Sequence, residues 1–556
     1  MVMATVVTAI TELFRQNTPG PAWIGRFPCR DMFQVVERAA TATNSLILRN
    51  QCMLDVGSGV EGKGGAPAVA GPAVSLEFFS TGERINVGNT AIRRSPRLGL
   101  LVAIAAASVG VIYGYDLSNI AGALLFITDE FGLTTRQQEL VTTAIVIGQI
   151  AGAVGGGMLA NAIGRKKSMV LVAVAYAAFA LLSALSVSVP MLLLSRFLLG
   201  LTIGVSVVVV PVFVAESAPA KVRGSLLVAY QVATVVGIII GYLVAYFLAG
   251  SGSWRWMLGL AAIPAVLVTL LLLWMPDTAR WYMLKGRVEE ARQTLRRVEP
   301  SADVEAELAE IRRALKEETG GAVREMLRRP YLRATVFVVV LGFFIQITGI
   351  NAIVYYSPRL FEAMGFEGYF ALLILPALIQ VAALVAVFVS LMLVDRVGRR
   401  PILLGGIAMM VAANAMLIGV FVAGTEFGGA LTAVGFLGVL LFTIGFTFGF
   451  GALVWVYAGE SFPTRLRSTG SSAMLTSDLV ANAIIAAFFL TMLNSLGGGG
   501  TFALFGVFAL AALVFVYRFA PETKGRPLEE IRHFWENGGR WPDEAGEAPE
   551  DAGMLK

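Results

Sequence analysis

The sequence contains few of the residues that build disulfide frameworks, metal centres or catalytic sites. Only two cysteines, Cys29 and Cys52, and one histidine, His533, occur in 556 residues. Both cysteines precede the first long apolar run, so neither a disulfide framework nor a metal-binding cluster is indicated. The sequence also lacks a recognisable nucleophile or phosphate-loop constellation. We therefore expect neither an enzyme nor a bound cofactor or metal.

Charge is scarce as well: 15% of the residues are charged, whereas 56% are hydrophobic. Stretches free of Asp, Glu, Lys and Arg recur along the chain, each long enough to cross the hydrocarbon core of a bilayer with about 20 residues. This pattern predicts an all-α membrane protein with twelve transmembrane helices. The predicted spans lie near 98–120, 139–160, 168–188, 191–214, 225–249, 255–275, 333–357, 370–394, 401–423, 430–457, 470–493 and 501–519.

The basic residues gather in alternate connections between these spans. Clusters lie at 93–97, 165–167, 221–223, 396–400, 465–467 and 524–526. By the positive-inside rule, both termini are expected in the cytoplasm, with the chain in the cytoplasmic (inner) membrane. Because this distribution accounts for the basic pI, no nucleic-acid partner is expected.

Two segments differ from the apolar runs. Residues 1–95 lack the basic start and cleavage site of a secretory signal, and they are expected to be a disordered extension or a start codon assigned too early. Residues 276–332 carry apolar residues at helical spacing on a charged background, which predicts short amphipathic cytoplasmic helices. The expected domains are the extension 1–95, a six-helix bundle 96–275, the linker 276–332, a second six-helix bundle 333–520 and a cytoplasmic tail 521–556.

The two bundles repeat a charged signature. "NAIGRKK" (from Asn161), "ESAPAKVR" and "PDT" in the first bundle correspond to "DRVGRR", "ESFPTRLR" and "PET" in the second. Glu216 and Arg223 are seven residues apart, as are Glu460 and Arg467. An internal repeat of six-helix units is typical of transporters that bind their substrate between the repeats near the membrane midplane.

These motifs resemble those of the sugar porter family of the major facilitator superfamily. Further matches are "RFLLGLTIG", "PVFVAESAPAKVRG", "QITGINAIVYYSP", "GESFPTRLR" and "PETKG", in order over residues 98–530. The resemblance implies a major facilitator fold of two six-helix halves. It also implies proton-coupled symport of a monosaccharide or polyol across the cytoplasmic membrane by alternating access. The alternatives are a facilitative sugar uniporter and a non-transporting sugar sensor. We expect it to function as a monomer.

Two charged residues inside the spans are candidates for proton coupling. A formal charge at the bilayer centre costs about 2.5–3.5 kcal/mol, so Asp116 in "VIYGYD" and Arg196 at the start of span 4 are functional candidates. They match the pair that couples proton and sugar movement in the family's bacterial symporters. Burial favours the neutral acid and a guanidinium favours the carboxylate, so the opposed effects permit protonation and release. A static ion pair between two helices is the alternative.

The resemblance also assigns sugar contacts, which are chiefly neutral amides and aromatic side chains. Amides both donate and accept hydrogen bonds, as sugar hydroxyls require. The expected substrate-binding residues are Gln231, Gln346, Asn351, Tyr355, Tyr356, Trp455, Asp478 and Asn482. Amides that merely join membrane helices are the alternative. Asp478 stands where the family usually has an amide, and it is interpreted as a sugar acceptor or a second titrating group.

Other positions depart from the family. Ile345, Ala383 and Leu479 replace a common glutamine, asparagine and aromatic residue, which predicts a pocket with fewer amides. The run "GFGALVW" before Trp455 lacks the family's prolines, which predicts a less hinged span 10. "TGI" at 348–350 predicts a local break of span 7 at Gly349.

The charged signature is expected to form a cytoplasmic gate between the halves. Its residues are Arg165, Glu216, Arg223, Asp395, Arg399, Arg400, Glu460 and Arg467. A single hydrated ion pair contributes only about 0–1 kcal/mol, so a network is needed to bias two conformations. Asn161 replaces the aspartate that the family usually has, so the first-half contribution is expected to be weaker. Topology anchors without a gating role are the alternative.

Overall fold

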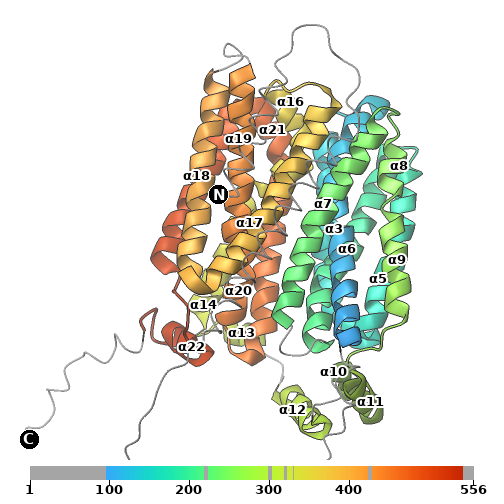
Figure 1. Cartoon of the computed structure of the whole chain (residues 1–556), viewed down its shortest axis with the longest axis vertical. Helices are drawn as coiled ribbons and strands as arrows, with labels where there is room; N and C mark the ends of the chain where they lie inside the picture. Colours follow the sequence, from blue (N-terminus) through green and yellow to red (C-terminus); the bar gives the residue numbers. More distant parts are fainter. Residues whose placement is uncertain are drawn as a thin grey trace, which may run out of the picture. The chain divides into compact units, whose positions relative to one another are not determined.

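The computed structural model describes residues 96–217, 223–298, 303–317, 322–329, 331–423 and 429–541. Throughout these ranges the regular elements are helical (Figure 1). The predicted extension 1–95 lies outside the described residues, as does the end of the predicted tail, 542–556. Helix labels are those of Figure 1.

The helices form two bundles joined by a linker. The first bundle contains α3 (Pro96–Phe131), α4 (Thr135–Ile163), α5 (Arg165–Ala184), α6 (Val189–Ser217), α7 (Arg223–Ala249), α8 (Trp254–Gly259) and α9 (Ala262–Leu273). The linker contains α10 (Ala279–Leu284), α11 (Val288–Val298), α12 (Val304–Glu317) and α13 (Ala322–Met326). The second bundle contains α14 (Leu332–Ile347), α15 (Ile350–Tyr355), α16 (Ser357–Ala363), η1 (Phe370–Ile374), α17 (Leu375–Val397), α18 (Arg399–Ala423), α19 (Gly429–Phe446), η3 (Thr447–Gly451), α20 (Ala452–Glu460) and α21 (Thr464–Phe519), followed by α22 (Leu528–Glu536).

Eleven helical stretches of the described chain are long and apolar enough to cross a membrane. The last of them, Leu466–Phe519, has 54 residues. It is interrupted at Gly497, which has a φ of 69° and a ψ of 171°. Because one crossing needs about 20 residues, this stretch passes twice and the described chain has twelve crossings. The predicted division between spans 11 and 12 therefore falls where a glycine tolerates a positive φ.

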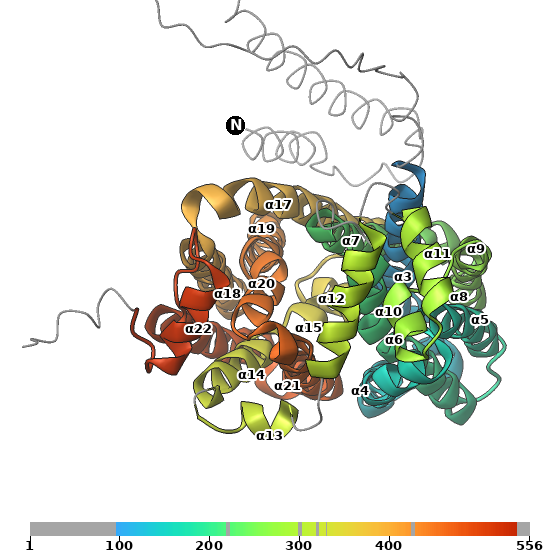
Figure 2. The ribbon, with the colours of Figure 1, turned by 90° about the horizontal axis from the view of Figure 1, so that it is seen from below.

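Close helix packing through glycines fixes the first bundle, in which α3 lies along α7 and α4 along α6 (Figures 1 and 2). A Cβ atom at Gly114 would lie 1.8 Å from the carbonyl oxygen of Thr234, and one at Gly152 would lie 2.1 Å from that of Leu201. Small residues at such crossings let membrane helices approach closely without a hydrophobic driving force. These close crossings fix where α3 and α6 lie, and they thereby fix the positions of the polar residues on the two helices.

Span 10 is irregular despite its lack of prolines. Five residues, Thr447–Gly451, form a π-helical turn between α19 and α20. A Cβ atom at Gly449 would lie 3.1 Å from the Cα atom of Gly406 on α18, so the turn is in close contact with its neighbour. The prediction of a less hinged span was therefore wrong, because a π-helical turn can distort a helix as a proline does.

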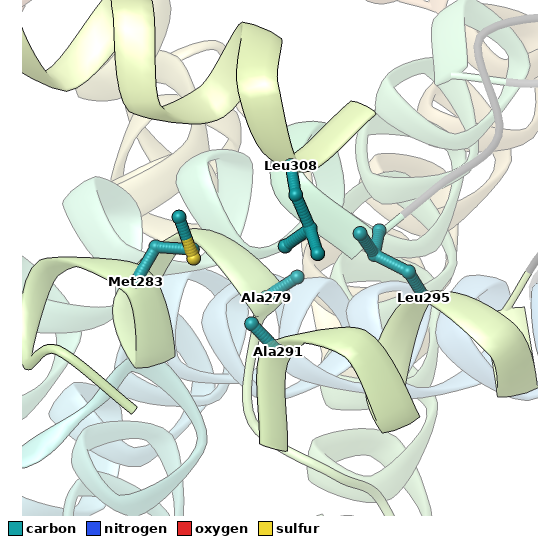
Figure 3. Packing of buried hydrophobic residues seen from close by; sticks show 5 residues of the cluster. All are labelled: Ala279, Met283, Ala291, Leu295 and Leu308. Atoms are coloured by element: carbon teal, nitrogen blue, oxygen red, sulfur yellow. The ribbon is translucent and has the colours of Figure 1, made fainter. Parts of the chain in front are cut away.

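The linker helices α10, α11 and α12 enclose a small apolar cluster (Figure 3). Its buried members are Ala279, Met283, Ala291, Leu295 and Leu308. At the surface, Arg292 Nε lies 2.6 Å from Glu305 Oε1 and joins α11 to α12. The hydrogen bond from Arg292 lowers the pKa of the Glu305 carboxyl. Exposed ion pairs add little stability, so the apolar cluster holds these helices together.

The glycine contacts generate a prediction. Gly114→Val places a side chain against backbone that cannot yield, so we expect a loss of stability at the upper end of the about 1–3 kcal/mol typical of overpacking. Thermal unfolding of the purified protein in detergent measures this loss. Gly155→Val is the matched control, because a Cβ atom at Gly155 meets nothing within 4 Å. Equal unfolding temperatures for the two variants would contradict the α3–α7 contact.

Candidate functional site

A buried ion pair joins α3 to α6 inside the first bundle. Arg196 Nη1 lies 3.0 Å from Asp116 Oδ1, and the side chains are 0% and 4% exposed. Tyr176 of α5 lies beside the carboxylate. Nε and Nη2 of Arg196 have no hydrogen-bond partner among the described residues. The contact between Nη1 and Oδ1 is therefore the one that holds the pair. If the two charges separate, the guanidinium loses this hydrogen bond and no other to a described residue.

A second polar cluster lies in the other bundle, between α14, α15 and α21. The side chain of Gln346 is within hydrogen-bonding range of Asp478. Asn482 Nδ2 donates to the hydroxyl of Tyr355 over 3.3 Å. Asp478 and Asn482 are four residues apart on α21 and therefore share a face of that helix. The structure thus brings four predicted substrate-binding residues together.

Two tyrosines place the ion pair and this cluster within electrostatic reach of each other. Tyr355 of the second bundle interacts electrostatically with Asp116, Arg196 and Asp478. Tyr113 of α3 interacts with Tyr355 and with both carboxyl groups. Tyr355 and Tyr113 come close to the charges of the other half because α15 packs against α3. Charged and polar groups from both halves are therefore electrostatic neighbours.

Several buried polar atoms of this site have no protein partner. They include Gln346 Oε1, Asn482 Oδ1 and the hydroxyl of Tyr230, judged over the described residues. Buried polar atoms in folded proteins are almost always hydrogen-bonded. The two unpaired amide oxygens of the cluster that contains Asp478 therefore favour binding of a polar ligand there.

The predicted break of span 7 is present and helps to shape the site. Helix α14 ends at Ile347 and α15 begins at Ile350, with Gly349 between them at a φ of 100°. A Cβ atom at Gly349 would lie 2.6 Å from the ring of Phe505. Only glycine fits this left-handed, crowded position. The break puts Gln346 and Asn351 on separate short helices.

Comparison with known proteins agrees with this arrangement. Residues 102–535 match the protein family described as "Sugar (and other) transporter". The chain belongs to this sugar transporter family. This transporter is 36% identical to the galactose-proton symporter of Escherichia coli (strain K12) over 445 residues, which are 79% of this chain and 95% of that protein. It is 34% identical to the arabinose-proton symporter of the same strain over 444 residues, or 79% of this chain and 94% of that protein.

A solved structure supports the same conclusion about the fold. The transporter is similar to the major facilitator superfamily proton:xylose symporter XylE bound to 6-bromo-6-deoxy-D-glucose, with a TM-score of 0.68 and 26% identity. The match covers 79% of this chain and 99% of that structure. The predicted twelve-helix major facilitator fold is therefore confirmed, and the family is one of transporters rather than enzymes.

The other predicted substrate-binding residues are not joined to the cluster by the contacts described above. Gln231 is half-buried on α7, Asn351 is buried on α15, and Trp455 on α20 is 47% exposed. Their roles stay predictions. The hydroxyl of Tyr356 donates to the carbonyl of Ala486 over 2.8 Å, and its contact with sugar also stays a prediction.

In the first half, the gate residues form a compact network around Glu216. Arg165 Nε lies 3.0 Å from Glu216 Oε2, and Thr278 Oγ1 donates to the same oxygen over 2.6 Å. Asp277 Oδ1 accepts a hydrogen bond of 3.0 Å from the backbone N–H of Arg165. This carboxylate caps the N-terminus of α5, where negative charge is favoured. The side chain of Arg223 lies outside the described residues.

The second half repeats the cap with different partners. Glu522 accepts hydrogen bonds from the backbone N–H groups of Arg399 and Arg400, over 3.0 and 3.1 Å, at the start of α18. Arg399 also pairs with Asp395 over 3.2 Å. Glu460 has Arg399 and Arg467 as electrostatic neighbours. These contacts join gate residues within one half, and the interdomain latch stays a prediction.

Contacts between the halves occur at the opposite end of the molecule, between α4 and α21. Glu139 is fully buried and accepts hydrogen bonds from Thr491 N and Thr491 Oγ1, over 2.7 and 2.9 Å. Arg136 pairs with Glu139 and donates to the carbonyl of Ala487 over 2.6 Å. In a regular α-helix, the N–H of Thr491 would bond to that carbonyl. The side chains of Arg136 and Glu139 therefore bind a backbone C=O group and a backbone N–H group of α21 that would otherwise bond to each other.

The sequence analysis missed Glu139 because only charges away from the ends of spans were considered. Its position, immediately before the uncharged run 140–164, resembles that of an interfacial residue. Tyr113 and Tyr230 were also missed, although they lie beside "GYD" and Gln231. No periodicity distinguishes these tyrosines from interfacial anchors.

The contacts of Glu139 generate a prediction about conformation. Glu139→Ala leaves Thr491 without its acceptor and Arg136 without its ion-pair partner, and hydrogen bonds to charged groups contribute about 1.5–3 kcal/mol each. We expect the separation of the two halves at this end to increase. Spin labels on cysteines introduced at the exposed Ser251 and Ser495, after replacement of the native cysteines, measure the distance distribution by pulsed electron resonance.

The matched control is Glu130→Ala at the same end of the molecule. Glu130 pairs with Arg255 over 2.7 Å, and both residues belong to the first bundle. We expect this variant to leave the distance between the halves unchanged. An unchanged distribution in Glu139→Ala would show that α4 and α21 are held together by other contacts.

Proposed function

We propose that the chain is a proton-coupled symporter of a monosaccharide or polyol that works by alternating access in the cytoplasmic membrane. The observation that carries this proposal is the buried Asp116–Arg196 pair, which lies within electrostatic reach of the polar cluster in the other half. A passive carrier has no need for a carboxylate in this environment, because an intramembrane charge is costly to maintain.

Protonation of Asp116 supplies the coupling. A proton removes the charge that holds Arg196, and the guanidinium then loses its only ionic partner at this site. Because α3 contacts both α7 and α15, a change at Asp116 reaches the contact between the halves directly. Proton binding thereby favours a different arrangement of the bundles, as alternating access requires.

A route for the proton is provided by a pocket between α3, α5 and α6. Tyr113, Tyr176, Thr202 and Ser206 contribute its polar lining. Tyr176 lines this pocket and also lies beside Asp116, so it connects the pocket to the carboxylate. Water or hydroxyl groups in such a pocket can transfer a proton to and from the carboxyl group.

Sugar recognition depends on the cluster of the second bundle. Gln346 and Asn482 each present an amide oxygen without a protein partner, and Tyr355 supplies a buried hydroxyl. These groups donate and accept hydrogen bonds, which suits a ligand with many hydroxyls. The half-buried Gln231 adds an amide from the first bundle, so a bound sugar would contact both halves.

The orientation and the gates follow from charge. The basic connections lie on the side of the linker, so we place the linker and both termini in the cytoplasm. Contacts of Glu139 and Arg136 hold the halves together at the opposite, extracytoplasmic end. The charged signature at the linker end then opens and closes the cytoplasmic gate, and one chain contains every part of this cycle.

The Asp116–Arg196 pair generates the central test of this function. Asp116→Asn keeps the shape but cannot carry a proton, so we expect uphill sugar uptake to be abolished while counterflow exchange continues. Uptake and counterflow of a radiolabelled sugar panel in proteoliposomes, with and without a pH gradient, measure both activities. Asp129→Asn, which removes an exposed carboxylate from the same helix, should retain uphill uptake. Full accumulation by Asp116→Asn would refute the proposed coupling.

A further inference from the structure

Asp478 differs from the other acidic residues buried in the described part of the chain. Those residues are Asp116, Glu139, Asp277 and Asp478. Asp116 and Glu139 pair with arginines. Asp277 accepts backbone hydrogen bonds at the start of α5. Asp478 has only the neutral side chain of Gln346 as a hydrogen-bonding neighbour, and no ion pair with a described residue involves it.

A buried carboxylate without a counter-charge is unfavourable in a low-dielectric interior. Asp116 does not relieve this, because it carries the same sign and is already neutralised by Arg196. The site as a whole therefore has one negative charge in excess when both acids are ionised. A ligand that brings a positive charge would balance it.

The unpaired atoms around Asp478 have the same hydrogen-bonding character. Gln346 Oε1 and Asn482 Oδ1 are acceptors without a described partner. The orientation of Asn482 is set by its Nδ2 group, which donates to Tyr355. Together with the two carboxylate oxygens of Asp478, these amide oxygens give the cluster more acceptors than donors. An ammonium group has three donors and no acceptor, and it matches this set, whereas a hydroxyl offers one donor.

We propose that Asp478, with the amide oxygens of Gln346 and Asn482, recognises an ammonium group on a hydroxylated substrate, such as an amino sugar or an amino polyol. This inference rests on the proposed function, since it names the substrate class of the same site. Gln231, Tyr355 and Tyr230 then contact the hydroxyl groups of the substrate. Asp478 is the specificity-determining residue.

A neutral, protonated Asp478 that donates to a sugar hydroxyl makes the opposite prediction. In that case the site would prefer the neutral sugar, and an ammonium group would be rejected as an unpaired charge. The two arrangements are distinguished by the preference between matched ligands that differ only in the replacement of a hydroxyl by an amino group.

The experiment measures binding and counterflow by the purified full-length transporter. The probes are hexoses of gluco, galacto and manno configuration, their amino forms substituted at C2, C3 or C6, and the uncharged N-acetyl derivatives. At a pH at which the amino group is protonated, we expect one amino form to bind about tenfold or more tightly than its parent, equivalent to about 1.4 kcal/mol. The N-acetyl form should lose this advantage.

Asp478→Asn should abolish the preference, Asp478→Glu should retain part of it, and Asp129→Asn should leave it unchanged. The inference is overturned if no amino form exceeds its parent sugar in the unaltered protein, or if the preference persists in Asp478→Asn. If Asp478→Asn does not fold, the comparison among the amino, parent and N-acetyl ligands with the unaltered protein decides.

Failure of this inference is separable from failure of the proposed function. Proton-driven accumulation of a neutral sugar without an amino preference would retain the symporter and reject the ammonium site. An amino preference without accumulation in a pH gradient would retain the ammonium site and reject symport.

Discussion

A carboxylate surrounded by apolar helices has to be paired or protonated, and this constraint governs the centre of the transporter. Asp116 lies opposite Arg196, with neither side chain appreciably exposed. The guanidinium makes no other described hydrogen bond through Nε or Nη2. Tyr113 of the first half and Tyr355 of the second half are electrostatic neighbours of this pair.

The helix packing makes this arrangement possible. Glycines such as Gly114 let α3 approach α7 at backbone distance within the first bundle, and α15 of the second bundle also packs against α3. At the end of the molecule where the linker lies, Asp277 and Glu522 cap the equivalent helices α5 and α18. A Cβ atom at Gly164 or Gly398 would lie 2.1 or 2.6 Å from these carboxylates, respectively. The repeat is therefore conserved between the halves in its atomic contacts, as well as in its charges.

The sequence predicted the spans, the internal repeat, the break at Gly349 and the meeting of Gln346, Tyr355, Asp478 and Asn482. These features depend on local chemistry or on motifs with fixed spacing. It did not predict the hydrogen bonds between Glu139 and Thr491 of α21, because these residues are 352 positions apart and meet only when the two bundles pack together. The π-helical turn before Trp455 was also missed, since no proline marks it. The partners of Glu216 lie in its own half, which charge patterning alone does not indicate.

The two buried acids Asp116 and Asp478 differ in their partners. Asp116 forms an ion pair with Arg196, whereas Asp478 has the amide of Gln346 as its hydrogen-bonding neighbour and no ion pair with a described residue. The first is suited to exchange a proton, and the second to select the charge of the substrate. The most direct measurement is the external pH of a lightly buffered suspension of proteoliposomes when the substrate identified by counterflow is added. Coupled transport predicts that the medium becomes alkaline as substrate enters. Entry of substrate without a change in external pH would contradict the account.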